Sequence, residues 1–143
     1  MAYKIFLDAN IVLDVLHADR EFHEDAKELF FAIEANICSA YYSESVLTII
    51  AYVLRKQMSS NQINSVIIEL NKKIGFLSSL KIHSTLAAQQ NPPDFEDALL
   101  YQIALHHQMD YFVTSNAKDF KKIQQAGLPV IQARELNKIL AQS

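Results

Sequence analysis

The sequence has very little cysteine, glycine or proline. One Cys, two Gly and three Pro occur among its 143 residues. The single cysteine, Cys38, excludes an internal disulfide framework and a zinc site built on cysteines, and we expect it to be a small buried side chain. So few Gly and Pro argue against a disordered chain and against an all-β fold rich in turns.

Long apolar runs are also missing. Apolar residues make up 50% of the chain, yet no run of them is long enough to span a bilayer. The first ten residues, MAYKIFLDAN, do not read as a signal peptide, because Asp8 interrupts the apolar run and no small-residue cleavage site follows. We therefore expect a cytoplasmic protein with no membrane segment. Its length suits one domain covering residues 1–143.

An excess of positive charge is missing as well. The chain has 13 Lys and Arg against 16 Asp and Glu, a formal net charge of −3. Proteins that hold nucleic acid through bulk positive charge are basic instead. A nucleic-acid substrate would have to depend on local features, such as metal ions held by acidic side chains.

What the chain does contain is an alternation of short apolar runs and amphipathic stretches. Strands are expected at 3–7, 37–40, 80–83, 111–115 and 129–132. Helices are expected at 11–16, 22–35, 43–57, 60–73, 94–108, 118–125 and 133–142. Ser60 is expected to be the N-cap of the helix at 60–73, and a further short helix is expected to run from Ser84 to the Pro92-Pro93 pair. Gly75 is expected to interrupt the pattern, and Gly127 to cap the helix before it. Alternating strands and helices predict an α/β fold, a three-layer α/β/α sandwich with a mostly parallel central sheet.

Acidic and amide side chains follow these strands. Asp8 comes directly after YKIFL, Glu44 lies just beyond the second strand, and Asp97 is in the first turn of the helix that Asp94 opens. After the strand YFVT come Ser115, Asn116 and Asp119. In open α/β sheets, ligands bind outside the carboxyl ends of the strands. We therefore expect these side chains to meet at one edge of the sheet.

Three carboxylates in one cleft repel one another unless a cation neutralises them. Hard oxygen ligands suit Mg²⁺ or Mn²⁺, which keep some water and use substrate phosphate to complete their shell. Such ions activate water and stabilise the leaving oxygen when a phosphodiester is hydrolysed. The placement of Asp8, Glu44 and Asp97 therefore predicts a metal site able to hydrolyse a phosphodiester, and a net charge of −3 is then compatible with a nucleic-acid substrate.

Each acid also has a simpler explanation. First-turn acids often serve the helix dipole, which applies to Glu44, Asp94, Glu96 and Asp97. Asp119 could cap the helix that carries Phe120, and Asp14 has a candidate ion partner in Arg20. Asp8 is harder to dismiss, because an acid that ends an apolar strand must face a polar cleft or a partner.

Four segments together resemble the motifs of the PIN-domain family, and of its VapC-like bacterial ribonucleases in particular. They are LDANIVLDVL at 7–16, SESVL at 43–47, DFEDALLYQIAL at 94–105 and YFVTSNAKDF at 111–120, in the family's order and spacing. The last two, close together near the C-terminus, are the most specific. The resemblance implies parallel strands between helices and, in active members, metal-dependent ribonuclease activity.

On this resemblance the family's three acids fall on Asp8, Glu44 and Asp97. Its fourth polar position falls on Asn116, where many members have Asp, and Asp119 would assist from about one helical turn further on. Asn is a weaker metal ligand than Asp and carries no charge, so the resemblance leaves open whether a second metal ion binds. Small bacterial members are often toxins held inactive by an antitoxin protein and are commonly dimeric, so both a cognate antitoxin and a homodimer are expected.

Further side chains have supporting roles in this interpretation. Asn10, Thr114 and Ser115 are expected to orient the carboxylates or metal-bound water, although Asn10 could equally cap the helix that begins near Ile11. Lys118, Lys121 and Arg55 are candidates for phosphate contacts, against the alternative that they are ordinary surface or helix-end cations. His106 and His107 are expected to face solvent or cap their helix, and His83 shows no ligand spacing with them.

Two other functions are weighed against the nuclease. A phosphatase or phosphotransfer domain could use Asp8 as nucleophile, but the haloacid-dehalogenase pattern wants Asp at position 10, which is Asn here. The second is a catalytically weak or inactive module that binds RNA or protein through the same fold, with its metal site weakened by Asn116. Stabilisation by Mg²⁺ or Mn²⁺ would discriminate between this module and the nuclease.

Overall fold

Five parallel strands form the centre of the molecule. In the computed structural model, which describes residues 2–142, they are β1 (Tyr3–Leu7), β2 (Cys38–Ser43), β3 (Gly75–Leu77), β4 (Tyr111–Val113) and β5 (Val130–Ile131). Their order across the sheet is β3-β2-β1-β4-β5, and all four pairings are parallel. This confirms the predicted α/β class. Residues 1 and 143 of the expected domain lie outside the described part of the chain.

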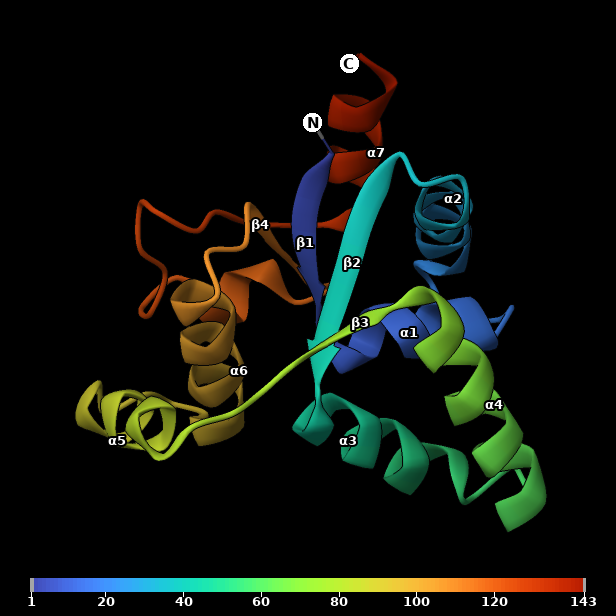
Figure 1. Ribbon diagram of the computed structural model, residues 1–143, viewed down its shortest axis with the longest axis horizontal. Coiled ribbons are helices and arrows are strands. Elements are labelled where there is room, and N and C mark those ends of the chain that lie inside the picture. The colour runs from blue at the N-terminus through green and yellow to red at the C-terminus, as the bar shows by residue number, and fades with distance from the viewer. Residues whose placement is uncertain (1, 143) are drawn as a thin grey trace.

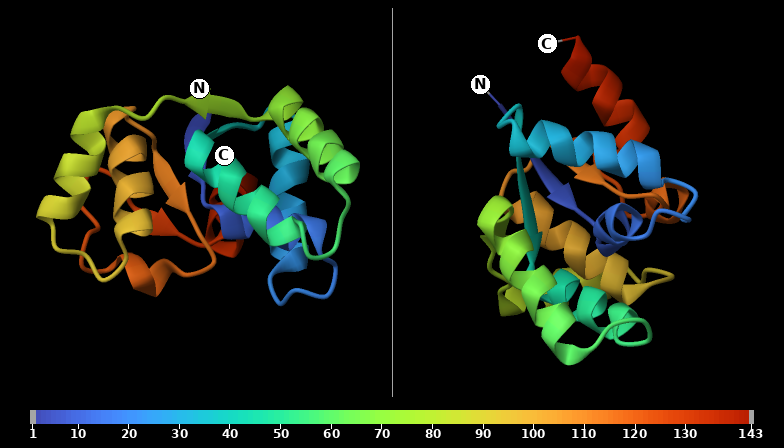
Figure 2. Two further views of the ribbon diagram at one scale, coloured as in Figure 1. Left: turned by 90° about the horizontal axis from the view of Figure 1, so that it is seen from below. Right: turned by 90° about the vertical axis from the view of Figure 1, so that its right-hand side faces the viewer.

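Helices connect the strands and lie on both sides of the sheet. They are α1 (Ala9–Leu16), α2 (His23–Glu34), α3 (Glu44–Leu54), α4 (Ser60–Lys73), α5 (Lys81–Gln89), α6 (Phe95–His106) and α7 (Ala133–Ala141), with a 3₁₀ turn η1 (Ala117–Phe120). Figure 1 and the left view of Figure 2 show α5 and α6 on one side of the central strands and α1, α2 and α4 on the other. No helix within residues 2–142 is long and apolar enough to cross a membrane.

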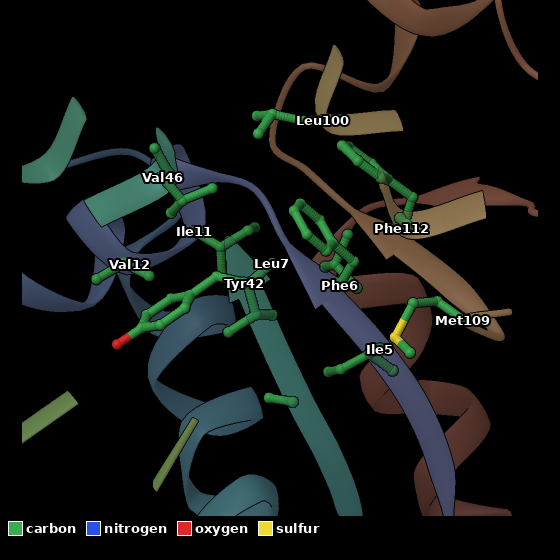
Figure 3. Packing of buried hydrophobic residues seen from close by; sticks show 14 of the residues in the cluster. Ile5, Phe6, Leu7, Ile11, Val12, Tyr42, Val46, Leu100, Met109 and Phe112 are labelled. Carbon is green, nitrogen blue, oxygen red and sulfur yellow. The ribbon is translucent and has the colours of Figure 1, made fainter. Parts of the chain in front are cut away.

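The core lies around the central strand. Ile5, Phe6 and Leu7 of β1 are each 0% exposed, which explains why this strand is a continuous apolar run rather than an alternating one. Phe6 stacks on Phe112 of the neighbouring β4 with ring centroids 5.2 Å apart. Figure 3 shows the two side chains within the core. Cys38 is buried, as expected, and burial raises the pKa of its thiol to about 11.

The strand register brings the ends of β1 and β4 together. Leu7 lies opposite Val113, and the backbone N–H of Asp8 donates to the carbonyl of Val113 over 3.0 Å. The residues that follow the two strands, Asp8 and Thr114, are therefore neighbours. The carboxyl ends of β1 and β2 point towards α3 in Figure 1.

The strand predicted at 80–83 is wrong. The edge strand β3 lies earlier, at Gly75–Leu77, and α5 begins at Lys81 rather than at Ser84. As predicted, the helical pattern ends just before Gly75, since α4 stops at Lys73, and Gly75 is the first residue of β3. A Cβ atom there would lie 2.5 Å from Cδ2 of Tyr41, so only glycine lets β3 pair beside β2 without displacing that ring.

The predicted helix at 118–125 is only the 3₁₀ turn η1, and Gly127 does not cap it. The chain continues in turns, because tertiary bonds hold the loop in another shape. The hydroxyl of Tyr101 accepts from the N–H of Gln125 (2.8 Å) and donates to the carbonyl of Leu128 (2.6 Å). The other predicted elements occur with boundaries shifted by a few residues, and the N-cap of α4 is Ser59 rather than Ser60.

Candidate active site

Asp8 lies buried at the carboxyl end of the central strand, with 6% of its surface exposed. It is the N-cap of α1: Oδ1 accepts from the N–H of Ala9 (2.8 Å), and Oδ2 accepts from the hydroxyl of Thr114 (2.8 Å). The pKa of the Asp8 carboxyl is raised: burial is the largest cause, the two hydrogen bonds oppose it, and the nearby charges of Glu96 and Asp94 add to it. The Asp8 carboxylate is thus held in place by two hydrogen bonds, and no basic side chain among the described residues lowers its pKa.

Asp97 belongs to the same electrostatic group. It is partly buried in the first turn of α6, where its N–H donates to the side chain of the N-cap residue Asp94 (3.1 Å). The pKa of Asp97 is raised to about 7, first by burial and then by the charges of Asp94, Asp8, Asp119 and Glu96, in that order. All four neighbours are acids, and no basic side chain within residues 2–142 lowers this pKa.

We call Asp8, Asp94, Glu96, Asp97 and Asp119 the acidic cluster. Its chemistry fits a hard divalent cation such as Mg²⁺ or Mn²⁺, because neighbouring carboxylates repel one another and no basic side chain within residues 2–142 lowers the pKa of Asp8 or Asp97. Among the described residues, however, no three His, Cys, Asp or Glu side chains are close enough to form a ready ligand set. The acids share one end of the sheet without closing around a point.

The position of Glu44 is one reason why the predicted acids do not form a ligand set. It lies in the first turn of α3, directly after β2, as predicted. Its side chain is exposed, and it is not among the charges that raise the pKa of Asp8 or Asp97. The structure therefore brings Asp8, Asp97 and Asp119 together electrostatically and leaves Glu44 at the rim.

The segment after β4 supports Asp8 through Thr114. Besides donating to Asp8, the Thr114 hydroxyl accepts from the backbone N–H of Asn116 (3.1 Å). The Asn116 side chain is exposed, and its role as a ligand remains a prediction. Asp119 lies within η1, which Asn116 begins, so the alternative that Asp119 caps this turn is wrong.

Ser115 bonds a different acid from those expected, and one of the two alternatives for Asn10 is excluded. The Ser115 hydroxyl donates to Oδ2 of Asp14 (3.0 Å) and not to the acidic cluster. Asn10 does not cap α1, because the helix already begins at Ala9 with Asp8 as its cap. Asp14 makes the predicted ion pair, with Oδ1 2.7 Å from Nε of Arg20.

Of the predicted phosphate contacts, only the lysines lie near the acidic cluster in the chain. Lys118 is in η1 and Lys121 directly follows it, and both are exposed. Arg55 follows the last residue of the 11-residue α3, about 16 Å along the helix from Glu44. Its guanidinium lies 4.1 Å from the ring centroid of Tyr52, which explains its position without RNA.

The histidines are closer together than the sequence indicated. The ring of His83 in α5 lies 4.7 Å from that of His106 and 6.4 Å from that of His107, centroid to centroid. As expected, His106 is exposed and His107 is the C-cap of α6, with Nε2 3.1 Å from the carbonyl of Ser78. His106 and His107 lie at the end of α6 opposite to Asp97, with the ring of His83 beside them, and the three form no ligand set.

Sequence reasoning gave Asp94 and Glu96 only a helix-dipole role. Asp94 does cap α6, but both also raise the pKa values of Asp8 and Asp97. The signal available in the sequence was the run DFED, in which three acids share the first turn of one helix.

Comparison with known proteins identifies the family. A family model described as PIN domain matches residues 4–118, most of the chain. The matched range includes Asp8, Glu44, Asp97 and Asn116, whereas Asp119 falls one residue beyond it. No curated protein matches the chain.

Solved structures share the fold at low sequence identity. DNA-bound VapBC from Salmonella typhimurium has a TM-score of 0.70 and 15% identity, covering 92% of this chain and 98% of that one. VapBC2 from Rickettsia felis, bound to a promoter DNA fragment, has a TM-score of 0.68 and 16% identity, covering 90% and 98%. VapC20 from Mycobacterium tuberculosis, described as a toxin that cleaves the sarcin-ricin loop, has a TM-score of 0.62 and 15% identity, covering 76% and 86%.

Proposed function

This chain belongs to the PIN-domain family, and we propose that it is a metal-dependent ribonuclease that hydrolyses RNA phosphodiester bonds. The observation that carries the proposal is the charge balance of the acidic cluster. The pKa of Asp97 is raised to about 7 by burial and by four other acids, and no basic side chain in the described part of the chain lowers it. A divalent metal ion would supply the positive charge that these carboxylates lack.

Asp8, Glu44 and Asp97 would hold Mg²⁺ or Mn²⁺, with Asn116 and Asp119 as further ligands. When bound, the cation offsets the carboxylates, activates the attacking water and stabilises the leaving oxygen. The chain's own residues prepare this site. Ala9 and Thr114 fix the two oxygens of Asp8, and the Asp94 side chain, by bonding the N–H of Asp97, holds the first turn of α6 in place.

A second proposal concerns partners. We propose that the protein is the toxin of a toxin–antitoxin pair, a cytoplasmic single-domain homodimer held inactive by a cognate antitoxin. The PIN-domain match and the shared fold with proteins described as VapBC and VapC20 support this role. Light scattering of the purified protein measures its oligomeric state. Co-purification with the product of an adjacent gene tests the antitoxin.

The direct test of the activity is cleavage of labelled RNAs with Mg²⁺, Mn²⁺ or EDTA. The panel includes single strands, hairpins and a sarcin-ricin loop, the RNA that VapC20 is described as cleaving. We expect cleavage that EDTA abolishes and that added Mn²⁺ restores. Cleavage that persists in EDTA would contradict a metal-dependent site.

One observation favours the alternative of an inactive binding module. Within residues 2–142, the carboxylates do not form a three-residue ligand set. Such a module would have no use for the metal. Its thermal unfolding temperature would not change with millimolar Mg²⁺ or Mn²⁺, whereas a metal site with a dissociation constant well below that concentration raises it. No stabilisation together with no cleavage would favour the module.

A further inference from the structure

A polar hollow of about 240 Å³ shares Asn116 with the proposed metal site, and its other walls have no role in the function proposed so far. Its walls are Asn10 and Asp14 of α1, residues 20–22 of the loop that follows this helix, and residues 115 and 116 after β4. Arg20 is the only basic side chain that lines it. We call this feature the Arg20 hollow.

Arg20 is fixed in this hollow through one of its five N–H donors. Its Nε donates to Oδ1 of Asp14 over 2.7 Å, while Oδ2 of the same carboxylate accepts from Ser115 over 3.0 Å. Asp14 is only 2% exposed, so it is a firm anchor. The two terminal amino groups of Arg20 have no partner within residues 2–142, and the side chain is 35% exposed. A rigid cation with unused donors is thus available to a ligand.

The segment 114–116 connects the Arg20 hollow to the acidic cluster. Thr114 bonds the carboxylate of Asp8, and the next residue, Ser115, bonds the carboxylate of Asp14. Asn116 lines the hollow and donates its N–H to Thr114. A molecule that occupies the hollow therefore lies next to the proposed reaction centre.

The lining chemistry fits one nucleotide of an RNA strand. A guanidinium with free terminal N–H groups binds phosphate oxygens in a bidentate manner. The amide side chains of Asn10 and Asn116 can donate to and accept from ribose hydroxyls or base edges. Phe22 offers a ring for stacking. Glu21 also lines the hollow, and its charge disfavours phosphate on its own side.

We infer that the Arg20 hollow is a nucleotide subsite of the RNA site, in which Arg20 binds a phosphate adjacent to the one that is cleaved. The inference rests on the proposed ribonuclease function and extends it. Arg20 supplies a fixed positive group where the acidic cluster would otherwise repel the RNA backbone. Asp14 and Ser115 are then positioning residues that aim the guanidinium.

The test measures RNA binding and cleavage separately. A fluorescent single-stranded RNA of mixed sequence is titrated with protein in EDTA, where the proposed activity is off, at several salt concentrations. Arg20→Lys keeps the charge beside Asp14 but loses the planar fork. The double variant Asp14→Asn/Arg20→Gln removes both charges, so no buried carboxylate is left unpaired. Arg134→Gln is the matched control, because Arg134 pairs with Asp25 (3.2 Å) outside this hollow.

We expect Arg20→Lys to bind the RNA about fivefold to tenfold more weakly with an unchanged salt dependence. The double variant should weaken binding at least as much and lower the slope of log K against log salt by about 0.7, the value of one lost phosphate contact on a single strand. Arg134→Gln should bind like the wild type. In cleavage assays the Arg20 variants should raise KM and leave kcat within about twofold.

Binding of both Arg20 variants that equals that of Arg134→Gln would overturn the subsite, whether or not the wild type cleaves RNA. If the wild type does not cleave but the Arg20 variants lose affinity and salt slope, the nuclease fails and the subsite stands. Thermal unfolding of each variant shows whether it folds. If the double variant does not fold, the RNA affinity of Arg20→Lys alone decides whether the subsite exists.

Discussion

The hydroxyl of Thr114 donates a 2.8 Å hydrogen bond to Oδ2 of Asp8, although the two residues are 106 positions apart in the chain. The bond exists because β1 and β4 are adjacent and parallel, with Leu7 opposite Val113 at their ends. This bond and the one from the N–H of Ala9 hold the Asp8 carboxylate in a single orientation. The fold thus places and aims the central acid of the proposed metal site.

Thr114→Val tests this relationship, because valine keeps the shape of threonine but cannot donate. We expect the affinity for Mn²⁺ or Mg²⁺ to fall about tenfold, since losing a group that orients a metal ligand typically costs that much. The measurement is the rise in unfolding temperature as metal is titrated. Thr114→Ser, which retains the hydroxyl, should restore most of the affinity. Equal metal affinity in Thr114→Val and the wild type would show that the bond does not support the site.

Asp97 makes the stability of the metal-free protein depend on pH. Its pKa is raised from 3.8 to about 7, so between these values the folded state binds more protons than the unfolded state. This group therefore destabilises the fold as pH rises from about 4 to 7. In EDTA at pH 8, Asp97→Asn should be more stable than the wild type, by about 1 kcal/mol or less because the side chain is only partly buried.

The comparison reverses in the presence of metal. With millimolar Mn²⁺ the wild type should gain stability that Asp97→Asn does not. Urea unfolding at pH 5 and pH 8, with and without Mn²⁺, measures both effects. A variant that is less stable than the wild type in EDTA at pH 8 would mean that burial and the neighbouring acids do not destabilise the charged form of Asp97.

Sequence reasoning located the acids because their positions follow from the order of strands. Asp8 ends an apolar run and Asp97 starts a helix, and the carboxyl ends of parallel strands share one edge of a sheet. The pair Asp14 and Arg20 was also predictable, since it lies within one local segment. Side-chain distance was not, and Glu44 is exposed at the rim rather than joined to the other acids.

The misplaced edge strand has a tertiary cause. β3 has three residues, of which Phe76 is 52% exposed, so it lacks the apolar run of a buried strand. It forms because Gly75 fits beside Tyr41 of β2, a contact between distant parts of the chain. The proximity of His83 to His106 depends in the same way on how α5 packs against α6.

His83 gives a pH dependence of the opposite sign. It is 1% exposed, and its Nδ1 accepts the N–H of Leu80 (2.9 Å), which places the ring proton on Nε2. Burial lowers the pKa of His83, and the neighbouring His106 and His107 lower it further. Below about pH 6.5 the unfolded state gains a proton that the folded state resists, so stability is lost as pH falls, by at most about 1.4 kcal/mol per pH unit.

His83→Gln separates titration from packing. Gln at this third helical position can still accept from the N–H of Leu80, as in a capping box, but does not titrate. The difference in unfolding free energy between wild type and variant, measured in urea at pH 7.5 and pH 5.5, cancels the contributions of the carboxylates. The wild type should lose stability relative to the variant at pH 5.5. A difference that is constant with pH would mean that His83 is free to protonate in the folded protein.

Asp8 is the residue on which the whole interpretation depends, and Asp8→Asn is its most direct test. Asp110→Asn is the matched control: Asp110 also bonds a backbone N–H, that of Lys4 (2.8 Å), but at the opposite end of the sheet. The measurement is the initial rate of RNA cleavage with Mn²⁺ for both variants, each shown to be folded. We predict that Asp8→Asn loses at least about a hundredfold in rate and that Asp110→Asn retains wild-type activity. Undiminished cleavage by Asp8→Asn would contradict a metal-dependent nuclease centred on Asp8.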